Sequence, residues 1–210
     1  MSTGFLASYV DEVTQVARGL DLAVMDGIVK RLVRLRDEGG RLFLCGVGGS
    51  AANCSHAVND FRKLAGIDAQ TAVDNVAEVT ARTNDEGWDT VFKAWFQVSR
   101  PTPKDVIMVF SVGGGNAEKK VSANLVAAID EAKRVGMDVL GIVGRDGGYT
   151  KQHGDLVVVI PTVNPANTTP HAEAFQAVVW HGLVCDPRLM NHSNKWEGLD
   201  GSAAVDGAVR

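Results

Sequence analysis

The chain has 210 residues, of which 45% are hydrophobic and 22% are charged, and its formal net charge is −4. This length supplies one well-buried core and does not require two, so we expect a single domain over residues 1–190. The 21 basic residues are scattered along the sequence. Nucleic-acid backbones are bound by Lys and Arg clustered on one face, so nucleic acid is a poor candidate partner.

The sequence contains no indication of a membrane segment or of export. No run approaches the roughly 18 apolar residues that a membrane span requires, and the N-terminus lacks the basic start and apolar stretch of a signal peptide. The three cysteines, Cys45, Cys54 and Cys185, are an odd number without close pairing. This spacing argues against a disulfide framework or a zinc ribbon, and we expect a cytoplasmic protein without membrane partners.

The N-terminal segment, residues 1–38, is expected to be helical. Apolar residues recur at helical spacing from Phe5 to Leu35, which predicts one or two amphipathic helices that end at Gly39 and Gly40. This segment carries more apolar surface than one small sheet can cover. We therefore expect it to mediate homo-oligomer formation.

Beyond the N-terminal segment, short apolar runs alternate with helical stretches. Buried parallel strands are predicted at 41–45, 105–110, 138–143 and 155–160. Helices are predicted at 51–64, 122–135 and 172–184. The alternation predicts an α/β fold, a doubly wound and mostly parallel sheet flanked by helices. Residues 191–210 turn polar and then rich in Gly, Ala and Asp, which predicts a partly disordered tail.

Three glycine-rich loops, 46–50, 111–116 and 144–148, follow three of the predicted strands. In doubly wound sheets ligands bind beyond the carboxyl ends of the strands, so we expect the three loops to surround one ligand. The first loop opens a helix. Its backbone N–H groups, the helix dipole and the Ser50 hydroxyl suit an anion such as phosphate.

The three loops can also be interpreted one at a time. The first loop fits the dinucleotide pattern G-x-G-x-x-A, with Asp68 or Asp74 as the ribose-binding acid, or it is simply a glycine turn. The second loop offers the Ser111 hydroxyl and the Asn116 amide, which suit a phosphate or a polyhydroxylated chain. The basic residues at 119 and 120 form either a solvated turn or phosphate contacts, and the third loop is either a turn or part of the site.

Two pairs of polar residues stand out on predicted helices. His56 and Asp60 are four residues apart and share one helix face near the first loop. Glu173 and His181 are eight residues apart, within about 80° on one face. Together they could form a divalent-metal site or an acid/base pair, although a single histidine is more often structural.

These features resemble the phosphoheptose isomerase branch of the sugar isomerase (SIS) family. The segments that carry the resemblance are Gly-Val-Gly-Gly-Ser-Ala-Ala with His56 downstream, residues 84–92, the loop at Ser111, residues 141–148 and the late helix ending in His181. It extends from the N-terminal helices to about Leu189. The resemblance implies a flavodoxin-like SIS fold and a homotetramer whose sites take residues from neighbouring subunits.

The resemblance also implies an activity, the isomerisation of sedoheptulose 7-phosphate to D-glycero-D-manno-heptose 7-phosphate in activated-heptose biosynthesis. Several family members bind zinc, so Zn²⁺ is the implied cofactor. The reaction proceeds through an enediol, with Asp60 as the candidate base and His181 as its acid/base partner. A metal would act as a Lewis acid on the sugar oxygens.

Site residues follow from the same resemblance, position by position. The metal and acid/base set is His56, Asp60, Glu173 and His181. The residues implied to bind substrate are Val47, Gly48, Gly49, Ser50, Asn84, Asp85, Ser111, Val112, Gly113 and Glu173, with Asn116 or Ser122 in the place of a closing serine.

The chain departs from the family pattern at several of these positions. Val47 replaces an Asn, Asp60 replaces a Glu, and Glu173 replaces a Gln. Between Ser111 and the next helix, this chain carries about six residues more than the family pattern. Two other functions therefore remain open: a non-catalytic SIS protein that binds a sugar phosphate or a protein, as the homologues that associate with the replication initiator do, and an isomerase of another ketose phosphate.

Overall fold

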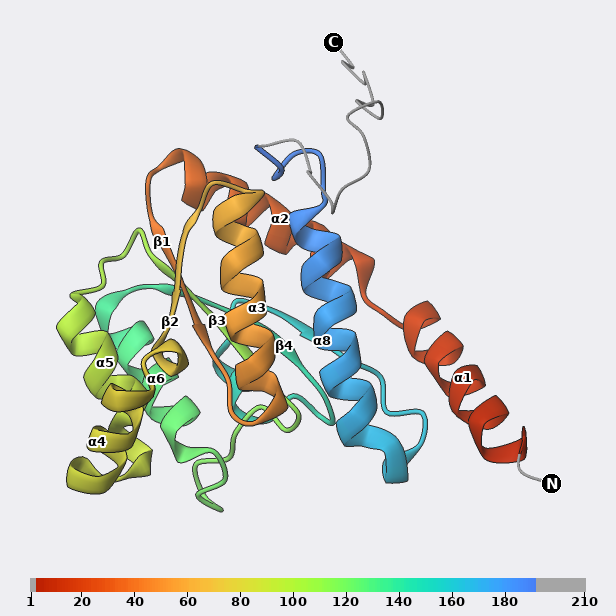
Figure 1. The fold of residues 1–210 in the computed structure, drawn as a ribbon. Helices are drawn as coiled ribbons and strands as arrows, with labels where there is room; N and C mark the ends of the chain where they lie inside the picture. Colours follow the sequence, from red (N-terminus) through yellow and green to blue (C-terminus); the bar gives the residue numbers. More distant parts are fainter. Residues whose placement is uncertain (1–2, 192–210) are drawn as a thin grey trace, which may run out of the picture.

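The computed structural model describes residues 3–191, and a five-stranded parallel sheet forms its centre (Figure 1). The strand order is β2-β1-β3-β4-β5, and every neighbouring pair is parallel. The strands are β1 Arg41–Cys45, β2 Asp68–Thr71, β3 Val106–Ser111, β4 Asp138–Val143 and β5 Leu156–Val159. This order confirms the predicted doubly wound fold and places the reversal of strand order between β1 and β3.

Helices flank the sheet on both sides. They are α1 Thr3–Arg18, α2 Leu22–Asp37, α3 Gly49–Lys63, α4 Val76–Glu86, α5 Val91–Ser99, α6 Ala123–Val135, α7 Gly148–His153 and α8 Thr168–Val184. One buried cluster joins α2, α3 and α8 to one face of the sheet, and a second joins α5 and α6 to the other face. Because both faces are covered, β3 is buried along its whole length.

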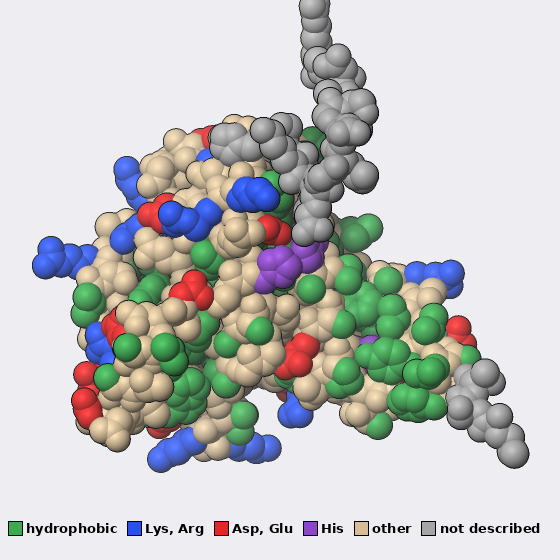
Figure 2. Space-filling view, in the orientation of Figure 1, with side chains coloured by type: hydrophobic (Ala, Val, Ile, Leu, Met, Phe, Trp, Pro, Cys, Tyr) green, Lys and Arg blue, Asp and Glu red, His purple; other side chains and the backbone are tan. Residues whose placement is uncertain are grey.

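The N-terminal segment forms two helices, as expected. The Asp21 carboxylate caps α2 by accepting hydrogen bonds from the N–H groups of Ala23 and Val24. Helix α1 lies at the side of the molecule, next to α8 (Figure 1). Its apolar residues Phe5 and Leu6 are 67% and 66% exposed, and Figure 2 shows apolar side chains gathered over this helix.

Several elements differ from the sequence-based expectations or fall outside what is described. Strand β2 was not predicted, and neither were helices α4, α5 and α7. The predicted tail lies outside the described residues, apart from Asn191. Within residues 3–191, none of the helices is both long and apolar enough to cross a membrane.

Candidate active site

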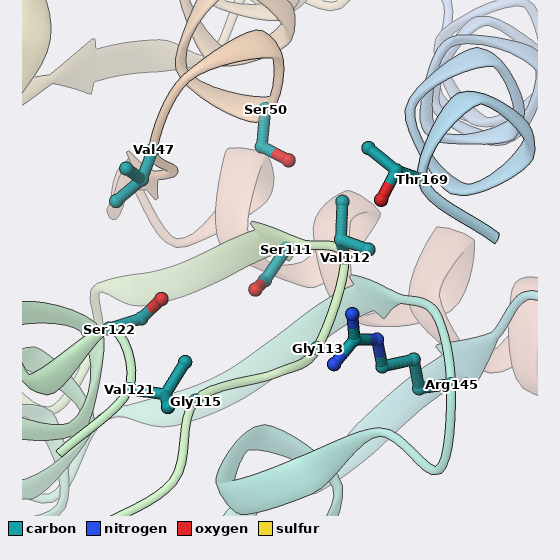
Figure 3. Close-up of a pocket in the computed structure, with 10 residues that line it drawn as sticks. All are labelled: Val47, Ser50, Ser111, Val112, Gly113, Gly115, Val121, Ser122, Arg145 and Thr169. Atoms are coloured by element: carbon teal, nitrogen blue, oxygen red, sulfur yellow. The ribbon is translucent and has the colours of Figure 1, made fainter. Parts of the chain in front are cut away.

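A cavity of about 240 Å³ opens at the carboxyl edge of the sheet (Figure 3). It lies beside the reversal of strand order, where doubly wound folds bind their ligands. Its walls come from the segments that follow β1, β3 and β4 and from the start of α8. The lining residues are Val47, Ser50, Ser111, Val112, Gly113, Gly115, Val121, Ser122, Arg145 and Thr169.

Three helix N-termini meet at this cavity. Ser50 lies in the first turn of α3, Ser122 immediately precedes α6, and Thr169 lies in the first turn of α8. None of these three helices has a side-chain hydrogen bond at its N-cap, whereas α2 and α4 are both capped in this way. The uncapped N–H groups and the positive ends of three helix dipoles therefore favour an anion in the cavity.

Hydroxyl groups and one cation complete the lining. The Ser111 hydroxyl oxygen accepts a hydrogen bond from the Gly114 N–H at 3.0 Å, which leaves its own proton available to a ligand. In Figure 3 the Ser122 hydroxyl and the Arg145 guanidinium point into the cavity from opposite walls. Among residues 3–191, Arg145 is the one charged residue that lines it. This set of donors matches the oxygens of a phosphate group.

The second and third loops are held together by direct backbone contact. Gly114 has a φ of +70°, and a Cβ at this position would lie 1.9 Å from the Gly147 carbonyl oxygen. The Thr150 N–H and hydroxyl both donate to the Gly114 carbonyl, at 2.9 and 2.8 Å. The third loop is therefore more than a turn, because its packing on the second loop places Arg145 at the cavity.

Four of the lining residues were not named as site residues from the sequence, although the first and third of them lie in loops expected to surround the ligand: Gly115, Val121, Arg145 and Thr169. Arg145 is one of four non-glycine residues with positive φ in the described part of the chain, and Ser122, which also lines the cavity, is another. Such backbone strain concentrates at functional sites. Thr169 was missed because α8 begins at Thr168, four residues before the predicted helix start.

The structure brings six of the expected substrate-binding residues together around the cavity: Val47, Ser50, Ser111, Val112, Gly113 and Ser122. Gly48 and Gly49 form the N-cap and first residue of α3, directly beside Ser50. The first loop therefore lies where the sequence suggested.

Three expected residues lie elsewhere in this chain. Asn116 closes the loop of extra residues through an antiparallel bridge with Val121, and its side-chain oxygen accepts the Lys119 N–H. Of the two alternatives for a closing serine, Ser122 is therefore the one that lines the cavity. Asn84 and Asp85 are exposed on α4, where the Asn84 amide donates to the Asp85 carboxylate, and neither lines the cavity.

A second polar group lies on the seam between α3 and α8 and consists of His56, Asp60 and His181. One potential ligand atom from each residue lies within 4.8 Å of the others. Asp60 Oδ2 is 3.9 Å from His56 Nε2 and 3.8 Å from His181 Nε2, distances too long for hydrogen bonds. The side chain of Asp60 is 8% exposed, whereas those of His56 and His181 are 59% and 40% exposed. The group therefore opens to the outer surface (Figure 2).

Neighbouring contacts orient this group. The His181 Nδ1–H donates to the Ala177 carbonyl at 2.8 Å, so the neutral ring keeps a lone pair on Nε2, facing Asp60. The Asn59 amide donates to Asp60 Oδ1 at 2.8 Å, which leaves Oδ2 facing the histidines. The Trp180 ring stacks on His181 at a centroid distance of 3.5 Å. Two imidazole nitrogens and one carboxylate with an open side fit a divalent metal in a catalytic arrangement.

Glu173, expected as the fourth metal ligand, lies apart from this group. Its carboxylate packs against Gly49, where a Cβ would be 2.5 Å from Glu173 Oε2. Glu173 and His181 share a helix face, but eight residues separate them by about 12 Å along the axis. Within one chain, the structure therefore brings together three of the four expected ligands.

The cavity and the His56–Asp60–His181 group also lie apart in one chain. Ser50 and Asp60 are ten positions apart on α3, or about 15 Å along the helix axis. The cavity opens at the edge of the sheet, and the group opens on the outer surface of α3 and α8. A small ligand in the cavity does not contact both within a single chain.

Comparison with known proteins identifies relatives that match most of this chain. The model of the SIS domain family matches residues 8–144. A protein named phosphoheptose isomerase from Rhodospirillum rubrum is 31% identical over 170 residues, which cover 78% of this chain and 82% of the relative. A second protein named phosphoheptose isomerase, from Roseiflexus, is 33% identical, and the match covers 70% of its length. Lincomycin biosynthesis protein LmbN from Streptomyces lincolnensis is 34% identical over 155 residues, but the match spans only 54% of its length.

Solved structures show the same fold. The phosphoheptose isomerase GmhA from Neisseria gonorrhoeae superposes with a TM-score of 0.76 at 21% identity, covering 88% of this chain and 98% of that chain. A phosphoheptose isomerase from Francisella tularensis gives 0.74 at 22% identity, with 88% and 96% covered. At these identities the structural likeness establishes the fold.

Proposed function

This chain belongs to the SIS domain family, in its phosphoheptose isomerase branch, and we propose that it isomerises sedoheptulose 7-phosphate to D-glycero-D-manno-heptose 7-phosphate. The product would feed activated-heptose biosynthesis. The observation that carries the proposal is the cavity at three uncapped helix N-termini, which suits the phosphate of a sugar phosphate.

Phosphate binding fixes the position of the sugar. Ser50, Ser111, Ser122 and Arg145 would hold the phosphate oxygens. Holding one end of the substrate places the reacting carbons at the acid/base residues, a positioning effect that supplies several kcal/mol of barrier lowering in enzymes generally.

The His56–Asp60–His181 group supplies the acid/base chemistry. Asp60 Oδ2 removes the proton from C1 of the ketose to give an enediol, and the proton is returned to C2. His181 Nε2, which carries a free lone pair in the neutral ring, moves a proton between the oxygens on C1 and C2. Zn²⁺ held by His56, Asp60 and His181 would use the His181 Nε2 lone pair, so in the metal-bound form Lewis-acid polarisation of the sugar oxygens would take the place of proton transfer by His181.

A homo-oligomer completes the site in this proposal. An extended seven-carbon sugar phosphate spans roughly 10 Å, given carbon–carbon bonds of about 1.5 Å. This is shorter than the separation of about 15 Å between Ser50 and Asp60 along α3. We therefore propose that the cavity of one subunit faces the acid/base group of another subunit in a tetramer. The exposed apolar residues of α1 support subunit association.

All three cysteines are free, with Cys45 and Cys54 buried and Cys185 exposed. Free thiols persist in a reducing compartment, which supports a cytoplasmic location.

A second candidate is the isomerisation of another ketose phosphate. Val47 and Val121 give the cavity two apolar walls, and Val121 belongs to the loop of extra residues. Incubation with sedoheptulose 7-phosphate and with pentose and hexose phosphates, with and without zinc, separates the candidates when products are followed by NMR. Preferential turnover of the heptose phosphate supports the proposal, whereas turnover of another ketose phosphate alone would replace its substrate. If no sugar phosphate is turned over, the chain would instead be a non-catalytic protein that binds a sugar phosphate or a protein.

A further inference from the structure

A chain of hydrogen bonds runs from the backbone of α8 to the floor of the cavity. Asn53 Nδ2 on α3 lies 2.9 Å from the Glu173 carbonyl oxygen and 2.9 Å from Gln176 Oε1. Gln176 Nε2 in turn lies 2.9 Å from the Ser50 hydroxyl oxygen. Gln176 is 0% exposed and Ser50 is 1% exposed. Solvent therefore does not replace the Gln176–Ser50 hydrogen bond.

The direction of every hydrogen bond in this chain follows from its first member. A backbone carbonyl can only accept, so the Asn53 atom facing the Glu173 carbonyl must be the NH₂ group. The same NH₂ group faces the Gln176 side chain, which must therefore present its oxygen to Asn53. Gln176 then has only its NH₂ group left for Ser50, and Ser50 must accept.

This order determines what the Ser50 hydroxyl can do for a ligand. A hydroxyl has one proton to donate. Because the Ser50 oxygen accepts from Gln176, its proton is not used in the chain and can be donated into the cavity that Ser50 lines. A serine whose proton was directed at Gln176 would instead offer an anion only lone pairs.

We propose that Asn53 and Gln176 are positioning residues that fix the Ser50 hydroxyl as a hydrogen-bond donor to the anionic group of the substrate. Neither residue lines the cavity, so both act through Ser50. The inference rests on the proposed function in taking that anionic group to be the phosphate of a sugar phosphate. It extends the site to two residues, one half-buried and one fully buried, that bind no ligand themselves.

Two nearly isosteric substitutions reverse the chain. In Asn53→Asp the new carboxylate can only accept, so Gln176 turns its NH₂ group to that carboxylate and its oxygen to Ser50, which must then donate to Gln176. In Gln176→Glu the ionised side chain accepts from Ser50 directly. Both variants therefore withdraw the Ser50 proton from the cavity without altering Ser50 itself.

The test uses inorganic sulfate as the probe, together with steady-state kinetics on sedoheptulose 7-phosphate. Because a hydrogen bond to a charged group is worth roughly 1.5 to 3 kcal/mol, Asn53→Asp and Gln176→Glu should each weaken sulfate binding about tenfold or more. They should raise KM for the sugar phosphate by a similar factor while changing kcat much less. Gln152→Glu, the same change on an exposed residue of α7, is the control and should bind sulfate as wild type does.

A double-mutant cycle with Ser50→Ala separates positioning from simple charge repulsion. If Asn53 acts through Ser50, Asn53→Asp costs no further sulfate affinity once Ser50 is replaced by Ala. An equal loss in both backgrounds would mean that the added charge repels the anion, and would overturn the inference. Wild-type affinity in the Asn53→Asp and Gln176→Glu proteins, or no sulfate binding by the wild-type protein, would also overturn it.

The outcomes distinguish this inference from the proposed function. Gln176→Glu places a charge at a fully buried position and can fail to fold. Asn53→Asp places its charge at a half-buried position, so it provides the test if Gln176→Glu does not fold. Sulfate binding that follows the cycle in a protein without isomerase activity would reject the proposed function and keep the positioning role. Isomerase activity with unchanged KM in both variants would reject the positioning role and keep the function.

Discussion

The Arg145 side chain lies against Gly113, so that a Cβ on Gly113 would be 3.8 Å from Arg145 Cδ. The two residues come from the loops after β4 and β3. The guanidinium extends into the cavity beside the backbone of Val112 and Gly113 (Figure 3). No ion pair or side-chain hydrogen bond holds the Arg145 side chain within the described residues, so the guanidinium remains available to an anion.

Replacing Arg145 should weaken phosphate binding. Arg145→Gln removes the positive charge that Arg145 places at the cavity, and we expect a loss of about tenfold in affinity for inorganic phosphate. Arg145→Lys should fall between wild type and Arg145→Gln. Arg100→Gln is a matched control, because Arg100 is also exposed with positive φ but precedes β3 at the opposite edge of the sheet. Equal losses in Arg145→Gln and Arg100→Gln would show that only overall charge matters.

Removing His56 should weaken zinc binding. Losing a partner that only orients a metal ligand costs roughly 10- to 100-fold in metal affinity, so losing a ligand in His56→Ala should cost at least as much. Isothermal titration with Zn²⁺ measures this effect, with His153→Ala on α7 as the control. Equal zinc affinity in wild type and His56→Ala would exclude the His56–Asp60–His181 group as the metal site.

The attachment of α1 should depend on pH through Glu12. Hydrogen bonds from Asn167, then His171 and Asn164, lower the pKa of Glu12 from 4.5 to about 2. A carboxylate with a lowered pKa stabilises the folded state fully above its unfolded pKa, and this contribution is lost as the pH falls from 4.5 towards about 2. The difference in unfolding free energy between wild type and Glu12→Gln should therefore shrink over that range.

Denaturant unfolding at several pH values measures this difference, and Asp11→Asn at the neighbouring exposed position controls for the loss of one charge on α1. A difference that stays constant from neutral pH down to about pH 3 would contradict the role of Glu12.

Exposed apolar residues of α1 should mediate oligomer formation. Leu6 is 66% exposed, and Leu6→Asp would place a charge in a buried subunit contact. Light scattering should give a mass near four times 22.3 kDa for the wild type and a smaller species for Leu6→Asp. Val98→Asp on α5, at a residue that is 69% exposed, should remain assembled. A wild-type mass of 22.3 kDa at micromolar concentration would exclude the oligomer.

The sequence predicted the strands that carry apolar runs, and it missed the one that does not. Strand β2 has the sequence Asp-Ala-Gln-Thr, and it is held by pairing with β1 rather than by a hydrophobic pattern of its own. The serines around the cavity could be predicted because glycine-rich loops after parallel strands meet at one edge.

Two features of the site required three-dimensional information. Arg145 reaches the cavity because Gly114 and Gly147 allow two backbone segments to approach closely, a contact that no local sequence pattern encodes. Glu173 was grouped with His181 on the angle between them around the helix, although their axial separation of about 12 Å keeps them apart. Angular position alone therefore overstated the metal-ligand set.

The dependence of isomerisation on Asp60 can be measured directly. Sedoheptulose 7-phosphate is incubated with the wild-type protein and with Asp60→Asn, and the aldose product is followed by NMR. The two proteins must first match in circular dichroism and elution volume. We expect the wild type to form D-glycero-D-manno-heptose 7-phosphate and Asp60→Asn to be at least about 100-fold slower, since general-base catalysis contributes roughly 10² to 10⁴. A wild-type protein that forms no aldose phosphate, or a folded Asp60→Asn protein with near-normal turnover, would contradict this mechanism.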